Sequence, residues 1–321
     1  MSAIYRRTGS LIVFLLSGLI AQAKDAHPDT VKAGIYINSI HNIDFRQKEY
    51  TIDCWLWLRY DNRALDFANN LEVPQAKTVN RSFFTMDSSD GHYFIQMKLQ
   101  CVMKDNWRIS HFPFDKQILR LSLENSQFDV HDMVFVPDTA GKHFDPRFTL
   151  NAWKIDSCTI SVSKKIYETA FGDETAKQPR TEYSSFRVLL SIERNATGIF
   201  WKMFLGMYLA FLIAYACFYI HADSMDSRFG LSVGALFAVV GNKYIVDSSL
   251  PETTSFTLVD TLHGLTLFFI FSVVGATAYS LHLVKENKLQ QSRRFDMLFA
   301  QVFLVLYILL NAWFIRQAMQ N

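Results

Sequence analysis

Two patterns of apolar and polar positions divide the chain. Between about 30 and 195, apolar and polar residues alternate in short runs bounded by turn-forming residues, which is typical of strands with one buried face. Beyond 195 lie four long apolar segments, at 199–220, 229–248, 256–284 and 295–315. Each is near the ~20 residues that a helix needs to cross a bilayer. The pattern predicts an immunoglobulin-like β-sandwich of about ten strands, followed by four transmembrane helices.

The clearest predicted strand has the sequence CWLWLRY. Its core face consists of Cys54, Leu56, Leu58 and Tyr60, and its outer face of Trp55, Trp57 and Arg59. Monomers rarely expose two large aromatics on an outer face without a purpose. The polar stretch 171–182 is expected to form a protruding hairpin loop. Further strands are expected at 32–40, 93–103, 116–123, 131–137, 152–163 and 184–193.

The second apolar segment is too polar to face lipid, because it contains Asn242, Lys243 and Asp247. Such a helix at membrane depth usually faces a water-filled cavity or the interior of a bundle. One stripe at helical spacing either lines a pore or packs closely on another helix through its glycines. The stripe consists of Gly230, Gly234, Phe237, Gly241, Tyr244 or Ile245, and Ser248.

The N-terminus resembles a secretory signal at 1–23, in which Arg6 and Arg7 precede an apolar run that ends before Ala21-Gln22-Ala23. The alternative is a fifth membrane helix. Export would place 24–195 outside the cytoplasm, as an extracellular or periplasmic domain of a multi-pass protein in the cell membrane. The remaining residues, 196–321, form the transmembrane domain. The segment 285–294 has four Lys or Arg and 249–255 has none, which fits a cytoplasmic and an outer connection respectively.

Composition narrows the functional classes. The net charge of +2 gives no reason to expect a nucleic-acid partner. No phosphate-binding Gly-rich loop and no HExxH motif is present, so the sequence gives no indication of an enzyme. The cysteines have none of the spacings of a metal site, and we expect neither a metal nor a cofactor. They are Cys54, Cys101, Cys158 and Cys217.

Residues 112–117, FPFDKQ, match the signature of the Cys-loop receptors, which are pentameric ligand-gated ion channels. The chain resembles this family over about 30 to 316. Further matches are an arginine before the first membrane helix, another at the start of the second, a Leu-Pro link to the third, and a tryptophan after the eighth strand. These residues are Arg194, Arg228, Leu250-Pro251 and Trp153.

The chain also departs from the family. The two cysteines that close the family's loop fall at Asp105 and Leu119, so this disulfide is excluded. In that respect the chain resembles the prokaryotic members. The resemblance implies a homopentamer around a central pore, with the lipid bilayer, permeant monovalent cations and a small-molecule agonist or protons as its partners.

The resemblance assigns candidate residues to coupling and permeation. Asp115 and Arg194 are expected to pair where the sensor meets the membrane, with Asp44 as a third member and Pro251 in the adjoining link. The pair either couples sensor to pore or is a structural salt bridge. Within the stripe, five copies of Phe237 would form a hydrophobic ring. The candidate selectivity residues are Asp226 and Asp247, and Lys243 is expected to pair with Asp247.

The family's agonist site lies between subunits and is lined by aromatic residues. Val79 occupies the position of one such aromatic, so a cage for a quaternary amine is incomplete. Glu124 either pairs with an ammonium group or is an exposed loop residue. The candidate agonist-binding residues are Trp55, Trp57, Glu124, Phe128, Phe171 and Tyr183.

The sequence thus favours a cation-selective channel that is opened by a small ligand or by pH. The alternative is a non-conducting binding or sensor module anchored by four helices.

Overall fold

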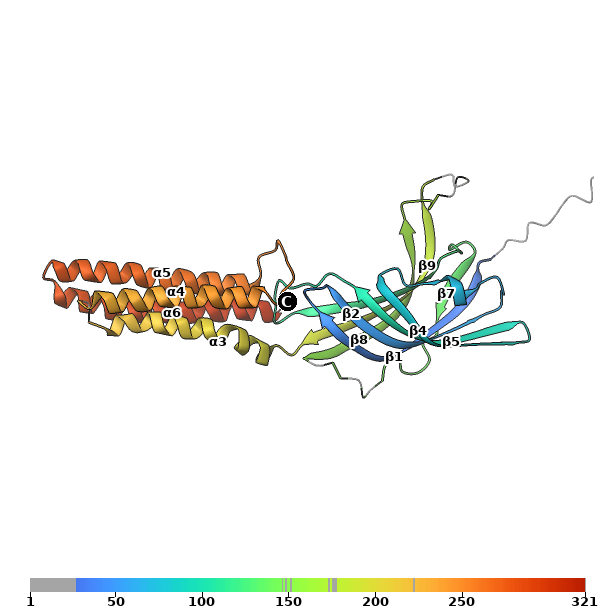
Figure 1. Ribbon diagram of the computed structural model, residues 1–321, viewed down its shortest axis with the longest axis horizontal. Helices are drawn as coiled ribbons and strands as arrows, with labels where there is room; N and C mark the ends of the chain where they lie inside the picture. The colour runs from blue at the N-terminus through green and yellow to red at the C-terminus, as the bar shows by residue number, and fades with distance from the viewer. Residues whose placement is uncertain are drawn as a thin grey trace, which may run out of the picture.

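The computed structural model describes residues 27–145, 147, 149–150, 152–172, 174, 178–221 and 223–320. A β-sandwich and a bundle of helices lie end to end along the long axis of the molecule (Figure 1). The predicted signal sequence, 1–23, lies outside the described residues.

The sandwich consists of a five-stranded and a four-stranded sheet, whose strand orders are β4-β5-β2-β1-β7 and β3-β6-β9-β8. The nine strands agree with the sandwich expected from the sequence, with one fewer strand than the ten or so predicted. A one-turn helix, α2, covers Phe67–Asn70. The strands are β1 (Asp29–Asp44), β2 (Glu49–Tyr60), β3 (Leu71–Glu72), β4 (Ala76–Ser89), β5 (His92–Lys104), β6 (Lys116–Asn125), β7 (Met133–Pro137), β8 (Trp153–Tyr167) and β9 (Thr181–Arg194).

The core of the sandwich is built from the alternate residues of its strands. In β2, Cys54, Leu56 and Leu58 are fully buried, whereas Trp55 and Trp57 are half-buried on the opposite face. Each buried leucine contributes roughly 1.5–3 kcal/mol through removal of apolar surface from water. The predicted division of this strand into two faces is confirmed.

Strand β4 was not among the expected strands. It is an edge strand that pairs with β5 from Ala76 opposite Met103 to Ser89 opposite His92. Nearly all of its residues are exposed. Only Ala76 and Phe84 pack against the core, so the strand has no sustained alternation of apolar and polar residues, which is the signal that sequence reasoning uses.

Four helices follow the sandwich, and each is long and apolar enough to cross a membrane. The link between α5 and α6 contains only residues 286–288, shorter than the ten or so expected, because α6 begins within the predicted polar link. The C-terminus lies near the sandwich (Figure 1). The helices are α3 (Ala196–Tyr215), which continues as the short 3-10 helix η1 (Ala216–Tyr219), α4 (Met225–Asp247), α5 (Leu258–Lys285) and α6 (Leu289–Gln320).

Candidate functional site

An ion pair lies where the sandwich meets the helices. Arg194, the last residue of β9, donates from Nε to Asp115 Oδ1 at 2.6 Å and from Nη2 to Asp115 Oδ2 at 3.2 Å. The two side chains are 8% and 1% exposed. This is a two-point, charge-assisted contact that is removed from water. The predicted contact between these residues is therefore present, and its role in coupling stays a prediction.

Three aromatic rings surround the guanidinium of Arg194. Its Cζ lies 4.0 Å from the ring centroid of Trp153, 4.6 Å from Phe45 and 4.8 Å from Phe112. The rings replace water around the charge with favourable cation–π contacts. The side chain of Asp44 accepts a hydrogen bond from the backbone of Gln47 within the β1–β2 turn, at 2.8 Å. No hydrogen bond or ion pair joins Asp44 to Arg194 in the described structure, and its neighbour Phe45 reaches the arginine instead.

The glutamine of the FPFDKQ motif holds the aspartate in place. Gln117 Nε2 donates to Asp115 Oδ2 at 2.7 Å and to the carbonyl of Arg108 at 2.9 Å. Its Oε1 accepts from the backbone N–H of Arg108 at 3.1 Å. The motif therefore needs both Asp115 and Gln117. The side-chain amide of Gln117 holds the backbone of the loop at Arg108 and, at the same time, the carboxylate of Asp115.

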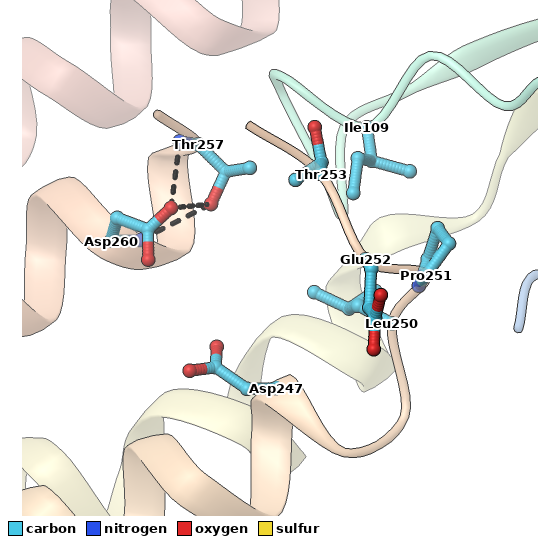
Figure 2. A pocket seen from close by; sticks show the side chains of 8 residues that line it. All are labelled: Ile109, Asp247, Leu250, Pro251, Glu252, Thr253, Thr257 and Asp260. Carbon is cyan, nitrogen blue, oxygen red and sulfur yellow. Dashed lines mark hydrogen bonds between the residues drawn. The ribbon is translucent and has the colours of Figure 1, made fainter. Parts of the chain in front are cut away.

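The link between α4 and α5 contacts this loop. The backbone N–H of Leu258 donates to the carbonyl of Ser110 at 2.9 Å. Pro251 is buried and lines a pocket of about 230 Å³ together with Ile109. Figure 2 shows Ile109 and Pro251 on one side of this pocket, with the carboxylates of Asp247 and Asp260 on the other. The loop is thus hydrogen-bonded to the first residue of α5 and shares a pocket with the link.

Lys243 joins the two helices on either side of that link. Its Nζ donates to Asp247 on its own helix and to Asp260 on α5, each at 2.7 Å. The predicted pairing of Lys243 with Asp247 is present, and the ammonium is directed toward the neighbouring helix.

Helix α4 packs on α3 and α5 through one face and exposes the other. Phe237 is 74% exposed, Tyr244 77% and Ile245 68%. Among the described residues, nothing lies within 4 Å of a Cβ built on Gly230 or Gly234, so within one chain these glycines do not serve close helix packing. The exposed stripe consists of Gly230, Gly234, Phe237, Gly241, Tyr244, Ile245 and Ser248, and the buried residues are Arg228, Ser232, Ala235, Val239 and Val246.

The two ends of α4 differ in their charges. Asp226 lies exposed in the first turn, where a negative charge is favourable for the helix. Two residues later Arg228 is buried and donates to Asp296 of α6 at 2.7 Å. At the other end, Asp247 is half-exposed and paired with Lys243.

A second candidate site lies at the far end of the four-stranded sheet. Glu124 is 3% exposed and accepts a hydrogen bond from the hydroxyl of Tyr167 at 2.9 Å. No Lys, Arg or His among the described residues forms an ion pair with it. A pocket of about 450 Å³ opens on this carboxylate, and its aromatic walls are Tyr167, Phe171 and Tyr183, with Glu72 and Pro74 beside them.

Burial and nearby carboxylates raise the pKa of two tyrosines in this pocket. Burial raises the pKa of Tyr167, and its hydrogen bond to Glu124 raises it further. Burial also raises the pKa of Tyr183, to which the nearby carboxylates of Asp129, Glu72 and Glu124 add. Glu124 is buried rather than an exposed loop residue, and a buried carboxylate without a countercharge is costly.

The other predicted agonist residues lie elsewhere in the chain. Phe128 packs against the core of the sandwich. Trp55 and Trp57 are on β2 in the opposite sheet. The ring of Trp55 contacts Phe83 edge-on at 5.3 Å, and Trp57 Nε1 donates to Asp138 at 3.0 Å. The two sets of residues do not meet within one chain.

Three curated proteins are similar to the chain over most of its length. A proton-gated ion channel of Gloeobacter violaceus is 22% identical over 308 residues, which cover 88% of this chain and 82% of that protein. A glutamate-gated chloride channel of Drosophila melanogaster is 20% identical, over 77% of this chain. The gamma-aminobutyric acid receptor subunit gamma-4 of Gallus gallus is 22% identical, over 83% of this chain. The chain spans 58% and 62% of the last two proteins. No protein-family profile matches it.

The chain belongs to the superfamily of pentameric ligand-gated ion channels. The sandwich followed by four membrane-crossing helices is the architecture of this superfamily, so the predicted fold is confirmed. Its members are channels rather than enzymes.

One hydrolase-like motif in this channel is accidental. Residues 230–234 have the letters of a GxSxG nucleophile elbow, which requires a sharp turn between a strand and a helix. Here they lie inside α4, and Ser232 Oγ donates to the carbonyl of Arg228 at 3.0 Å.

An ion pair lies where other members of the superfamily have a disulfide. All four cysteines are free. Asp105, at one cysteine position, accepts from Arg120 Nη1 at 2.8 and 3.1 Å, and Arg120 adjoins Leu119 at the other position. This contact closes the FPFDKQ loop at its base.

Sequence reasoning missed three residues of these sites. Phe45 and Tyr167 were not singled out, because an aromatic residue in a turn or strand has no local signal of its partner. Asp296 had one usable signal, since an acidic residue in a membrane segment normally requires a partner.

Proposed function

We propose that the protein is a homopentameric, cation-selective channel in the cell membrane, with its sandwich outside the cytoplasm and its pore lined by α4. The exposed stripe of α4 carries this proposal. A single helix cannot enclose a pore, whereas five copies around an axis present five such stripes to one lumen.

Phe237 is the proposed gate. Five rings in the middle of the membrane would exclude water from the closed pore. Gly234 and Gly241 flank Phe237 along the helix, and because glycine has no side chain they would leave wider sections of the pore above and below the ring of Phe237.

Asp226 is the proposed selectivity residue. Five exposed carboxylates at the inner mouth attract cations and repel anions. Asp247 is the second candidate, although its pairing with Lys243 offsets its charge. The relatives include a chloride channel, so charge selectivity has to be measured in this protein.

The pocket at Glu124 is the proposed agonist site. The buried carboxylate and the three aromatic rings suit an ammonium group. A neighbouring subunit would contribute Trp55 to the site, with Trp57 as the alternative. The relatives are named for protons, glutamate and gamma-aminobutyric acid, so they do not agree on one ligand.

The route from agonist to pore would run along β9 to Arg194 and Asp115, and then through Pro251 to the end of α4. The contact between Leu258 and Ser110 supports this route, because it joins the loop to the helices directly.

Current recordings from the purified protein in planar bilayers test the proposal. We expect currents when small amines are added or the pH is lowered, and a reversal potential in a salt gradient that follows the cation. Native mass measurement should give five copies. Binding of ligand without any current would favour the alternative, a membrane-anchored sensor that does not conduct.

A further inference from the structure

The end of α4 nearest the sandwich has one ammonium group that is shared between two carboxylates. Lys243 Nζ donates to Asp247 Oδ2 on the same helix and to Asp260 Oδ1 on α5, each at 2.7 Å. Among the described residues, no other Lys or Arg forms an ion pair with either carboxylate. A contact that Lys243 gives up on one side therefore strengthens its pairing on the other.

The two carboxylates differ in their exposure to water. The side chain of Asp247 is 49% exposed and that of Asp260 is 25% exposed. Water screens a charge less when the charge is partly buried, so Asp260 attracts the shared ammonium more strongly than Asp247 does. Asp260 therefore limits how far Lys243 neutralises Asp247.

The carboxylate of Asp260 is held in place by the start of its own helix. Its Oδ2 accepts from the backbone N–H of Thr257 at 2.9 Å and from Thr257 Oγ1 at 2.8 Å, as the dashed lines in Figure 2 show. In return, Thr257 Oγ1 accepts from the backbone N–H of Asp260 at 3.2 Å. One carboxylate oxygen thus caps α5 while the other is left for Lys243.

Asp247 and Asp260 also differ in their relation to the exposed stripe of α4. Asp247 is the last residue of α4 and directly precedes Ser248 of the stripe. Asp260 lies on α5, which contributes no residue to the stripe. If five copies of α4 line a pore, Asp247 is the carboxylate nearer the lumen, and Asp260 lies behind it.

We propose that Asp260 sets the negative charge at the outer mouth of the pore by holding Lys243 away from Asp247. It is a positioning residue, which acts through the lysine and needs no contact with the permeant ion. This inference rests on the proposed cation-selective pore lined by α4.

Single-channel recordings from the full-length protein in bilayers at low ionic strength test it. Asp260→Asn should lower the unitary conductance for cations that enter from the outer side to about half or less, because Lys243 then neutralises Asp247. The loss should shrink as salt is added. Asparagine retains a carbonyl oxygen that can accept from Thr257, so the variant keeps the cap and loses only the charge. Lys243→Gln should raise the same conductance, since it leaves Asp247 unpaired.

Two further variants separate the charge from the helix cap. Thr257→Ala removes the capping hydroxyl but keeps all three charges, so it should lower thermal stability and leave the unitary conductance unchanged. Asp260→Asn made together with Lys243→Gln should lower the conductance much less than Asp260→Asn alone, because no ammonium is left to move. If Asp260→Asn does not assemble, Lys243→Gln still tests the inference, and a fall in its conductance would contradict it.

The outcomes distinguish this role from the proposed pore. If Asp247→Asn lowers the conductance and Asp260→Asn does not, the outer mouth stands and the role of Asp260 is wrong. An equal loss from Asp260→Asn with and without Lys243 would likewise overturn the inference, because Asp260 would then act directly. If neither Asp247→Asn nor Asp260→Asn changes the current, or if no current is obtained, the proposed pore itself is wrong.

Discussion

Asp115 and Arg194 are 79 residues apart in the sequence and form a two-point ion pair at the junction of the sandwich with the helices. Removal of one partner leaves a buried charge uncompensated, at a cost of about 3–5 kcal/mol. Asp115→Ala and Arg194→Ala should therefore each abolish gating or assembly. The double variant should lose much less than the sum of the two, because the second change removes the stranded charge.

The measurement is a double-mutant cycle on the agonist concentration for half-activation in variants that still give current, and on the thermal stability of the purified protein where current is abolished. Surface expression is the control for assembly. Zero coupling energy in channels that assemble would show that the pair does not transmit the signal. Arg194→Lys tests whether the two-point geometry of the contact matters, since lysine keeps the positive charge but cannot make the two parallel hydrogen bonds of the guanidinium.

Replacement of Phe237 should weaken the proposed gate. The side chain is 74% exposed within one chain, so Phe237→Ser removes little packing there. It should raise leak current or lower the agonist concentration that opens the channel, because a pore lined by a ring of serines remains hydrated. Val239→Ala, a change at a buried position of the same helix, is the matched control and should alter stability instead. Unchanged leak and agonist response in Phe237→Ser would move the gate elsewhere.

Charge at the inner mouth should set ion preference. Asp226→Lys is expected to lower cation conductance and to shift the reversal potential in a salt gradient toward that of the anion. Glu286→Gln removes an acidic side chain in the α5–α6 link that is ion-paired with Lys288, and it should leave the reversal potential unchanged. If Asp226→Lys also leaves conductance and reversal potential unchanged, Asp247 becomes the candidate for the selectivity residue.

The pH dependence of stability should include a contribution from Asp53. Burial raises the pKa of this carboxyl, but hydrogen bonds from Ser39, Gln100 and His41 outweigh it and lower the pKa. A lowered folded-state pKa stabilises the fold above the unfolded value of about 3.9, and this stability is lost as the pH falls through the folded value. Thermal unfolding between about pH 6 and pH 3 should therefore show a smaller loss in Asp53→Asn than in the unmodified protein. An identical loss in both would contradict this assignment.

The buried pair of Arg228 and Asp296 should support the inner end of the bundle. It joins α4 to α6 at 2.7 Å, and Ser280 of α5 donates to the same carboxylate at 3.0 Å. Asp296→Ala should destabilise the protein by about 3–5 kcal/mol, since it leaves the buried Arg228 without a countercharge. Asp296→Asn should cost less because it retains a hydrogen-bond acceptor. Thermal stability of the purified protein, with the exposed Asp223→Ala as the control, provides the comparison.

The sequence by itself determined the features that repeat locally. The two faces of β2 and the membership of the stripe on α4 follow from the periods of a strand and a helix, which are set by backbone geometry within a few residues. The exposure of that stripe within one chain was decided by the structure. The pair of Asp115 and Arg194 was likewise expected, because the FPFDKQ motif and the arginine before the first membrane helix resemble those of a known family.

Only the tertiary structure decided which distant residues meet. Phe45 and Trp153 around Arg194, Tyr167 on Glu124, and Asp296 on Arg228 depend on the packing of segments far apart in the chain. The burial of Glu124 and the exposure of β4 depend on sheet order, which no local period encodes. The physical reason is that a period constrains the direction of a side chain, whereas register and packing between elements determine what lies in that direction.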